Sequence, residues 1–180
     1  MLTLAPLTPS DLPSVAHVTV HPDQIKFSGT VAEAFQASEP DVDFHGIFEN
    51  DTAVGFFKID RAYAARYPFA APHGLGLRAF MIDAARQGTG IGTQSCRLLP
   101  DYLRARYPDQ SKLWLTVNFT NPTAYRAYRS GGFQDTGHVW PHGDAGPQNV
   151  LMLNYTAEAT SPRHKSGPSS HLSANRAAQH

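Results

Sequence analysis

The chain has 180 residues, and its 15 lysine and arginine side chains balance its 15 aspartate and glutamate side chains. This length fits a single domain, and a hydrophobic content of 41% is enough to form a sizeable core. The neutral balance argues against a protein dedicated to nucleic-acid binding, which would show an excess of basic residues. The single cysteine, Cys96, excludes an internal disulfide framework and a cysteine-rich zinc module.

Strands and helices alternate along the first half of the chain. Thr8 and Pro9 predict the start of a helix, because threonine caps a helix N-terminus and proline fits its first position. Thr30 predicts a second short helix through VAEAFQA, and Asn50-Asp51 is a hairpin signal between two strands. The predicted strands are Leu2–Pro6, Asp43–Glu49, Thr52–Ile59 and, after a long connection, Leu75–Asp83.

The second half continues this alternation. A predicted helix from Gly90 to Arg106 contains Pro100, which cannot donate a hydrogen bond to the carbonyl of Cys96, so we expect either a bend or two shorter helices. The segment Asn121–Gly131 begins with a capping residue and a proline and ends with glycine, which predicts another helix. The remaining predicted strands are Lys112–Asn118, Phe133–Trp140 and Gln148–Tyr155.

Composition changes after Tyr155. Residues Ala157–His180 contain no aromatic side chain and one large aliphatic side chain, Leu172. Such a segment cannot bury enough apolar surface to offset the entropy lost on ordering. We therefore expect one domain formed by residues 1–156 and a disordered tail formed by residues 157–180.

A glycine-rich segment, RQGTGIG, follows the predicted strand Leu75–Asp83 and opens the next helix. Glycines let backbone N–H groups approach a ligand, and a helix N-terminus presents unpaired N–H groups, so the segment suits a pyrophosphate. A dinucleotide-binding turn would need a glycine where Thr93 stands, and a Walker-type loop would need a lysine. A third pattern, Gln-x-x-Gly-x-Gly, matches at Gln87, Gly90 and Gly92.

A second pattern lies downstream, in residues 121–133. Its spacing is Asn-x-x-Ala-x-x-x-Tyr, and it ends in Gly-Phe. Taken alone, it fits a capped amphipathic helix with Tyr128 packed in the core. Together the two patterns resemble the coenzyme A signatures of the GNAT acetyltransferases, in the order of that family and separated by one helix and one strand.

This resemblance covers roughly Met1 to Tyr155 and implies the GNAT fold. That is an α/β fold with a mixed, mostly antiparallel central sheet of about seven strands and with four helices. In members of the family two neighbouring strands splay apart, and the acetyl-pantetheine arm lies between them. The corresponding strands of this chain would be Leu75–Asp83 and Lys112–Asn118. The implied activity is that of an acyltransferase, an N-acetyltransferase that passes the acetyl group of acetyl-CoA directly to a primary amine. The implied co-substrate is acetyl-CoA, with no metal.

The resemblance also implies roles for individual residues. Backbone groups of Phe80, Met81 and Ile82 would pair with the pantetheine arm like an added strand. Asn121 would lie near the end of the splayed strand, and Tyr128 would lie near the sulfur and protonate the leaving thiolate. The pyrophosphate would be held by the backbone N–H groups of Gln87, Gly88, Thr89, Gly90, Ile91 and Gly92.

The general base is where this sequence departs from the family. Several family members have a glutamate early in the splayed strand, and Arg78 stands near that position. An attacking amine must lose a proton to a base or to a water relay. The candidates are Asp60, His45, Glu49, Asp83, His73 and a chain of water molecules.

Charge is divided along the chain. From Asp23 to Asp60 there are eight acidic residues and two basic ones, whereas from Arg86 to Arg129 there are seven basic residues and two acidic ones. The basic segment coincides with the implied coenzyme A side, where phosphates must be bound. The acidic segment coincides with the side that binds the acceptor in this family. Its negative charge could attract a polyamine acceptor, or the acidic residues could simply face solvent. The segment His21–Phe27 and the string FMID are loosely similar to diamine and polyamine acetyltransferases.

Other functions stay open at this stage. They are a coenzyme A-binding regulatory module without turnover and an acetyltransferase that acts on an amino-sugar antibiotic or a protein N-terminus. His138, His142 and Asp144 fit a polar turn better than a metal site, and Cys96 fits helix packing better than a nucleophile. The expected partner is a small-molecule amine, and a homodimer is left open.

Membrane and export signals are not apparent. No stretch approaches the ~18 apolar residues that span a bilayer. The first residues, MLTLAPLTPSDLPS, lack the basic region of a secretory signal. We therefore expect a soluble cytoplasmic protein that acts without a membrane or a nucleic acid.

Overall fold

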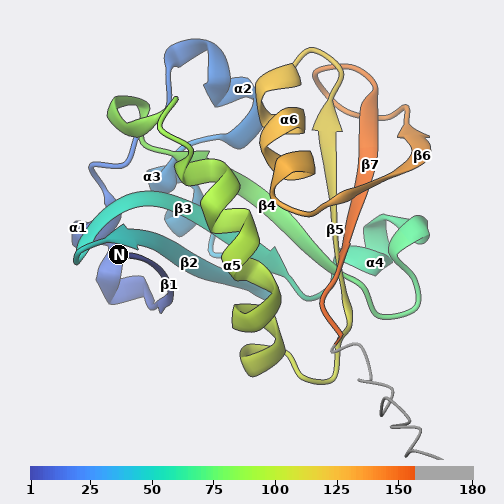
Figure 1. The fold of residues 1–180 in the computed structure, drawn as a ribbon, viewed down its shortest axis with the longest axis horizontal. Helices are drawn as coiled ribbons and strands as arrows, with labels where there is room; N and C mark the ends of the chain where they lie inside the picture. Colours follow the sequence, from blue (N-terminus) through green and yellow to red (C-terminus); the bar gives the residue numbers. More distant parts are fainter. Residues whose placement is uncertain (157–180) are drawn as a thin grey trace, which may run out of the picture.

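The central sheet has seven strands in the order β1-β2-β3-β4-β5-β7-β6 (Figure 1). Neighbouring strands are antiparallel except β4 and β5, which confirms the mixed, mostly antiparallel sheet. The computed structural model describes residues 1–156, and the predicted disordered tail lies outside the described residues. The strands are β1 (Leu2–Leu7), β2 (Val42–Glu49), β3 (Thr52–Asp60), β4 (Leu75–Ile82), β5 (Lys112–Asn118), β6 (Gln134–Trp140) and β7 (Gln148–Asn154).

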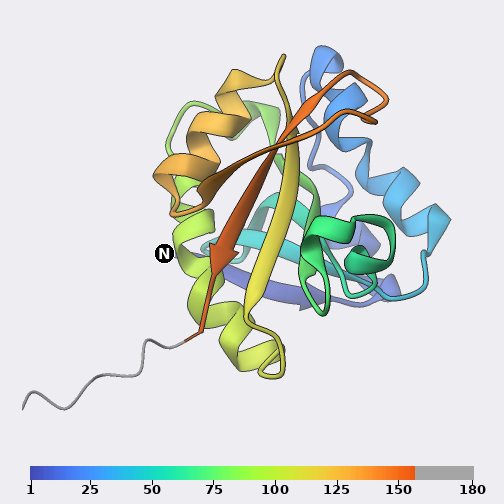
Figure 2. The same cartoon turned by 90° about the vertical axis from the view of Figure 1, so that its right-hand side faces the viewer.

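Helices cover both faces of this sheet. α5 and α6 lie on one face, and α1, α2 and α3 lie on the other (Figure 1 and Figure 2). Phe57 belongs to the core on the α5 side and Phe56 to the core on the α1 and α3 side, because successive strand residues face opposite sides. In the part of the chain that the structure describes, no helix is long and apolar enough to cross a membrane. The α-helices are α1 (Leu12–Val15), α2 (Ile25–Ser28), α3 (Val31–Ala37), α4 (Tyr63–Arg66), α5 (Ile91–Arg106) and α6 (Pro122–Ser130).

Local sequence signals set several of these boundaries. The Asp11 carboxylate accepts a hydrogen bond from the N–H of Thr8 at 2.6 Å. Thr30 Oγ1 accepts from the N–H of Glu33 at 3.2 Å, and the Glu33 carboxylate accepts from the N–H of Thr30 at 2.9 Å. The hairpin residues Asn50-Asp51 have φ values of 47° and 72°, which suit the twist of a two-residue hairpin turn. The predicted helix starts at Thr8, ahead of α1, and at Thr30, ahead of α3, are confirmed, and so is the predicted hairpin.

Two details differ from the sequence prediction. α5 runs through Pro100 as one helix, so a division into two shorter helices is wrong. The fully buried Leu99 and Leu103 hold the turns on both sides of the proline against the core. In addition to the four expected helices, α2 and α4 each form a single turn in connecting segments. Four residues are too few to show a helical period, so no sequence pattern marks them.

β4 and β5 pair only at Leu75–Leu113 and Gly76–Trp114 and then diverge. Gly76 permits a close contact at this point, because a Cβ there would collide with the ring of buried Tyr63. Beyond Gly76, the edge of β4 that faces β5 has no strand partner, so its backbone N–H and C=O groups are free to bond to a ligand. The predicted splayed pair is confirmed.

A buried hydrogen-bond chain joins β2 to the C-terminal end of α5. His45 is 1% exposed; its Nδ1 lies 2.6 Å from the Tyr102 hydroxyl, and its Nε2 lies 3.2 Å from the Tyr107 hydroxyl. Tyr107 donates its proton to Asp43 at 2.7 Å, so it accepts from Nε2, and Nδ1 then accepts from Tyr102. This chain requires a neutral imidazole. Burial, reinforced by the charge of Arg106, lowers the pKa of His45 to about 4.

We expect the free energy of unfolding to fall as the pH is lowered from 6.5 to about 4. In this range the unfolded chain protonates His45 while the folded chain keeps it neutral, so protonation favours unfolding. The loss is about 3 kcal/mol, at ~1.4 kcal/mol per unit of pKa difference. His45→Gln should lack this loss, because an amide can accept from Tyr102 and donate to Tyr107 without titrating. Denaturant unfolding of both proteins across this pH range measures the difference, and identical pH profiles would contradict the assignment.

Candidate active site

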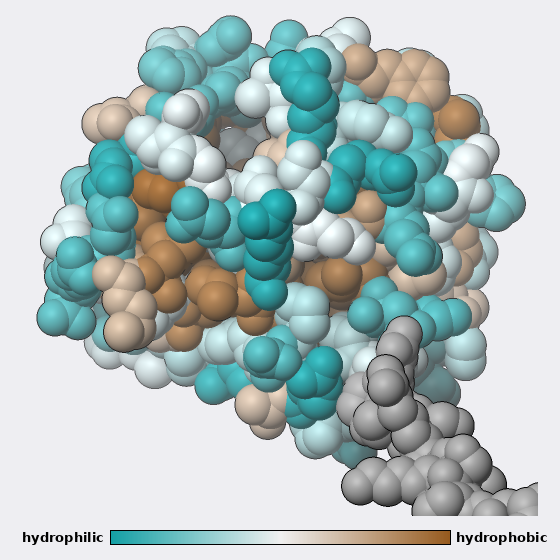
Figure 3. Space-filling model, viewed as in Figure 1, coloured by the Kyte–Doolittle hydropathy of each residue, from teal (hydrophilic) through white to brown (hydrophobic). Residues whose placement is uncertain are grey.

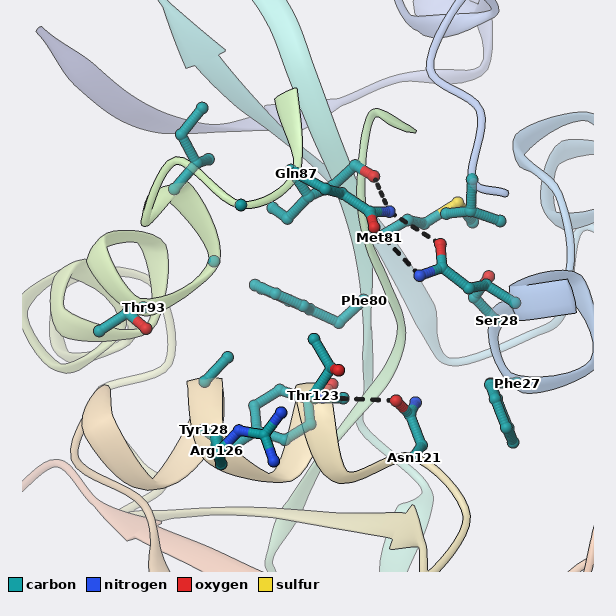
Figure 4. A pocket seen from close by; sticks show the side chains of 18 of the residues that line it. Phe27, Ser28, Phe80, Met81, Gln87, Thr93, Asn121, Thr123, Arg126 and Tyr128 are labelled. Atoms are coloured by element: carbon teal, nitrogen blue, oxygen red, sulfur yellow. Dashed lines mark hydrogen bonds between the residues drawn. The ribbon is translucent and has the colours of Figure 1, made fainter. Parts of the chain in front are cut away.

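β4 carries a bulge in its ladder with β3, on the edge opposite the one that faces β5. Its register against β3 shifts between Phe56 and Lys58, so that Ala79 and Phe80 together lie opposite one residue of β3. Ala79 has a φ of 51°, in the left-handed region. A bulge interrupts the ladder and redirects a side chain. Here the ring of Phe80 projects toward the space between α5 and α6 (Figure 4).

The N-terminus of α5 supplies unpaired N–H groups. Its first helical hydrogen bond runs from the N–H of Gln94 to the carbonyl of Gly90 at 3.0 Å. The N–H groups of Ile91, Gly92 and Thr93 therefore have no helical acceptor, and no side chain caps the helix. Gly90, with a φ of 84°, turns the chain into the helix. These donors and the partial positive charge of the helix end suit a pyrophosphate.

The side chain of Gln87 positions this loop. Its Nε2 donates to the carbonyl of Ile82 at 3.0 Å and to Oε1 of Gln24 at 2.8 Å, and Nε2 of Gln24 donates back to Oε1 of Gln87 at 3.0 Å (Figure 4). This amide pair fastens the loop to the end of β4 and to the segment before α2. The side chain of Gln87 is therefore a positioning group, and its backbone N–H is the expected phosphate contact.

α6 forms the opposite wall. Asn121 caps it by accepting from the N–H of Ala124 at 3.3 Å, as its position before Pro122 predicts. The ring of Tyr128 is mostly buried and makes edge contacts with Phe80 and Phe133, each with centroids 5.6 Å apart. Burial raises the pKa of the Tyr128 hydroxyl, so the phenol keeps its proton at neutral pH. A protonated phenol in a cleft is suited to act as a general acid.

Two pockets meet at Phe80 and Tyr128. The first has a volume of about 350 Å³ and lies among the loop before α5, α6 and α2. A hollow between these elements is visible on the face shown in Figure 3. The second has a volume of about 510 Å³ and reaches β5 and the connection between β6 and β7. The two pockets form one cleft because they share Phe27, Ser28, Phe80, Asn121, Ala124 and Tyr128.

The structure gathers nearly all the residues predicted to contact coenzyme A around the first pocket. Thr89 is the exception: it does not line the pocket, and its hydroxyl donates to the carbonyl of Arg86 at 2.6 Å. The residues that do line it are Phe80, Met81, Ile82, Gln87, Gly88, Gly90, Ile91, Gly92, Asn121 and Tyr128.

Sequence reasoning missed several other lining residues. Arg86 and Arg126 add positive charge to the first pocket, and Phe27 and Ser28 form a wall of both pockets. Arg86 is the first residue of the glycine-rich segment, and this position is a signal that could have found it. Arg126 and the α2 wall depend on how distant segments pack, which no local pattern shows.

The structure does not bring the predicted general bases to either pocket. His45 is held in its buried chain, and Asp60 is 1% exposed, with its carboxylate accepting from Arg66 and Arg78. Glu49 pairs with Arg86 at 2.5 Å. The residues concerned are Asp60, His45, Glu49, Asp83 and His73, none of which lines the cleft.

Two titratable side chains from the predicted polar turn line the second pocket. They are His142 and Asp144, in the connection between β6 and β7. Within residues 1–156, no group of three or more His, Cys, Asp or Glu side chains is arranged to hold a metal ion. Cys96 is fully buried, and burial raises the pKa of its thiol to about 12, which confirms a packing role.

The acidic segment does not give the cleft a surplus of negative charge. Glu39 pairs with Lys58 at 2.7 Å and with Arg78 at 2.8 Å, and Asp60 pairs with Arg66 and Arg78. Neither carboxylate lines a pocket, whereas all three cations line the second one. The expectation of an acidic acceptor side is therefore wrong for these residues. Pairing between distant segments neutralises charges that the sequence shows as clustered.

Comparison with known families agrees with this geometry. The model of the Acetyltransferase (GNAT) family matches residues 11–133, which include the loop, α5, β5 and α6. The chain belongs to the GNAT acetyltransferase family. No curated protein sequence matches it.

Solved structures share the GNAT fold of this chain. The aminoglycoside acetyltransferase AAC(6')-Ib in complex with coenzyme A and kanamycin is 19% identical with a TM-score of 0.70, over 86% of this chain and 95% of that chain. The spermidine N-acetyltransferase from Vibrio cholerae in complex with coenzyme A and spermine is 16% identical with a TM-score of 0.62, over 86% of this chain and 95% of that chain. At these identities the likeness shows the fold.

Gly92 offers a direct test of the pyrophosphate position. A Cβ there would lie 3.7 Å from Ile82 Cγ1 and 3.8 Å from Ala127 Cβ, so it fits without strain but occupies the first pocket. We expect Gly92→Ala to leave the unfolding free energy unchanged or higher, because alanine favours a helix by up to about 1 kcal/mol. The affinity for acetyl-CoA should fall roughly 10-fold through lost bonds to a charged group.

Calorimetry and denaturant unfolding measure the two effects. Gln94→Ala is the matched control, because Gln94 is exposed on the first turn of the same helix and lines neither pocket. Unchanged affinity in folded Gly92→Ala would contradict the pyrophosphate position.

Proposed function

We propose that this protein transfers the acetyl group of acetyl-CoA to a primary amine of a small molecule. The continuous cleft carries the proposal, because a coenzyme pocket opens into a second pocket at Phe80 and Tyr128. A module that only bound coenzyme A would need the first pocket alone. Two structures of the same fold contain coenzyme A together with an amine, kanamycin or spermine, which supports this division of the cleft.

Coenzyme A is proposed to occupy the first pocket. Its pyrophosphate would lie against the N-terminus of α5, and Arg86 and Arg126 would add charge near the phosphates. Its pantetheine arm would follow the unpaired edge of β4 and bond to backbone groups of Phe80–Ile82. This arrangement directs the thioester toward the junction of the two pockets.

The chemistry at the junction is a direct displacement. The amine nitrogen attacks the thioester carbon, a C–N bond forms, and an oxyanion develops on the carbonyl oxygen. A backbone N–H of the interrupted β4 ladder can stabilise this charge. The C–S bond then breaks, Tyr128 gives its proton to the leaving thiolate, and the nitrogen releases its surplus proton to solvent, from which Tyr128 is reprotonated.

The amine must lose a proton before it attacks. The second pocket is lined by His142 and Asp144, which can accept this proton directly or through a water molecule. We assign deprotonation to these residues in place of the five predicted bases, because those lie outside the cleft.

The remaining assignments follow from the co-substrate. The cytoplasm is the proposed compartment because acetyl-CoA is available there. A homodimer is a separate proposal, which sedimentation would test.

Tyr128→Phe is the variant that tests the proposed acid. We expect the fold and the affinity for acetyl-CoA to be retained, because only a hydroxyl is removed from a ring that packs on Phe80 and Phe133. The rate of transfer should fall by roughly 10²–10⁴, the range for loss of a general acid. A thiol-release assay with a panel of primary amines measures the rate.

Tyr125→Phe is the control, because the Tyr125 hydroxyl donates to Asp135 at 2.8 Å and the residue lines neither pocket. If the chemical step limits the rate and Tyr128→Phe leaves that rate unchanged, Tyr128 has only a packing role. Acetyl-CoA binding without turnover of any amine would overturn the proposed activity.

A further inference from the structure

The second pocket, which the proposed function assigns to the amine, presents cations on its β4 side. Lys58, Arg66 and Arg78 line it, and Lys26 lies on its α2 side. The one acidic side chain among the residues that line this pocket is Asp144. This lining is unexpected for a pocket that takes a cationic substrate, since an ammonium is repelled by these groups.

The positive and negative charges of the ion pairs behind this pocket wall do not cancel. Lys58, Arg66 and Arg78 share two carboxylates, Glu39 and Asp60, so three positive charges face two negative ones. Burial disfavours the charged form of Glu39, but hydrogen bonds from Lys58 and Arg78 outweigh it and lower the pKa of Glu39 to about 2. Both carboxylates stay behind the lining surface, so the surplus positive charge faces the pocket.

Arg78 has the free donors. Both of its hydrogen bonds to protein, 2.8 Å to Glu39 and 3.2 Å to Asp60, come from Nη1. Its Nε and Nη2 make no hydrogen bond to residues 1–156, and its side chain is 26% exposed. Nε and Nη2 form a fork with the spacing of two carboxylate oxygens, which gives a bidentate, charge-assisted bond.

The β5 side of the same pocket carries a complementary group. Asn118 is 7% exposed and lines the pocket, and its Oδ1 has no hydrogen-bond partner within residues 1–156. A buried acceptor without a partner is costly unless a ligand satisfies it. An amine N–H or a water bound to it is a suitable donor.

The positions of these groups set the shape of the substrate. Arg78 precedes Phe80 by two residues on β4, with the bulge residue Ala79 between them, so their Cα atoms are at most about 7 Å apart. A molecule whose amine lies at the Phe80–Tyr128 junction can therefore reach Arg78 with a group only a few bonds away.

We propose that the acceptor is an amine that also carries a carboxylate, bound through Arg78 with Lys58 beside it, as in an amino acid. The proposal rests on the acetyltransferase function proposed above and narrows its substrate. It separates this protein from acceptors such as spermine, which carries several ammonium groups and no carboxylate.

Matched pairs of amines test the proposal. Lysine and 1,5-diaminopentane differ only by a carboxylate, as do phenylalanine and 2-phenylethylamine. We expect kcat/KM to be at least roughly 10-fold higher for the carboxylate-bearing member of a pair. Calorimetric binding of the same compounds to the protein saturated with coenzyme A should show the same preference without turnover.

Arg78→Gln should remove the preference by raising KM for the amino acid, whereas KM for the decarboxylated amine should not rise, because that amine makes no bond to the guanidinium. In this variant the Asp60 carboxylate still pairs with Arg66 and still accepts a hydrogen bond from the N–H of Ala62. The Glu39 carboxylate still pairs with Lys58, so neither carboxylate is left without a partner. Arg61→Gln is the matched control. Arg61 pairs with surface carboxylates and lines neither pocket.

The outcomes separate the two proposals. Turnover of amines with equal values within each pair, or with a preference for the decarboxylated member, overturns the carboxylate proposal and leaves the acetyltransferase function intact. A binding preference for the carboxylate in the coenzyme A complex, without turnover of any amine, supports the proposed recognition and overturns the enzymatic function. The wild-type comparison decides both points even if Arg78→Gln fails to fold.

Discussion

The two-residue pairing of β4 with β5 is the constraint on which the cleft depends. Tyr63 packed on Gly76 holds the strands together at one end, and the bulge at Ala79–Phe80 draws β4 away at the other. A continuous ladder would satisfy the backbone of both strands and close the space that α6 now borders. Leaving N–H and C=O groups of β4 unpaired costs about 1–3 kcal/mol for each buried group, and a ligand that pairs with this edge, as proposed for the pantetheine arm, would recover that cost.

Charge in this protein is organised by tertiary pairing. Glu39, which precedes β2, and Asp60, which ends β3, meet arginines and a lysine from β3, α4 and β4. The result is a chain without net charge whose second pocket is lined by four lysine and arginine side chains and one carboxylate, Asp144. Net charge and segment charge therefore describe the unfolded chain better than they describe the surfaces that a substrate meets.

Much of the fold could be predicted because its signals are local. β5 has the predicted bounds, and the caps at Thr30 and Asn121 lie at the predicted residues. The lining of the first pocket could also be predicted from the sequence, because the glycine-rich loop and Tyr128 belong to two patterns with a defined residue spacing.

What could not be predicted depends on distant segments. The Gln24–Gln87 pair joins residues 63 positions apart, and Lys58 and Arg78 meet Glu39 only in the folded sheet. The predicted bases lie outside the cleft for the same reason: burial and ion pairing decide where a carboxylate lies. The one-turn helices α2 and α4 carry no period that a sequence could display.

The shared wall of the two pockets has a kinetic consequence. The two pockets share one wall, formed by Phe27, Ser28, Phe80, Asn121, Ala124 and Tyr128, and otherwise have separate linings. The proposed sites for coenzyme and amine can therefore be filled together in a ternary complex. The acetyl group then never needs to reside on the protein. Cys96, the single thiol of the chain, is sealed in the core and cannot carry it. If both proposed sites are filled together, initial-rate lines should intersect, as in a sequential mechanism, and should not run parallel as they would if an acetylated enzyme formed between two half-reactions.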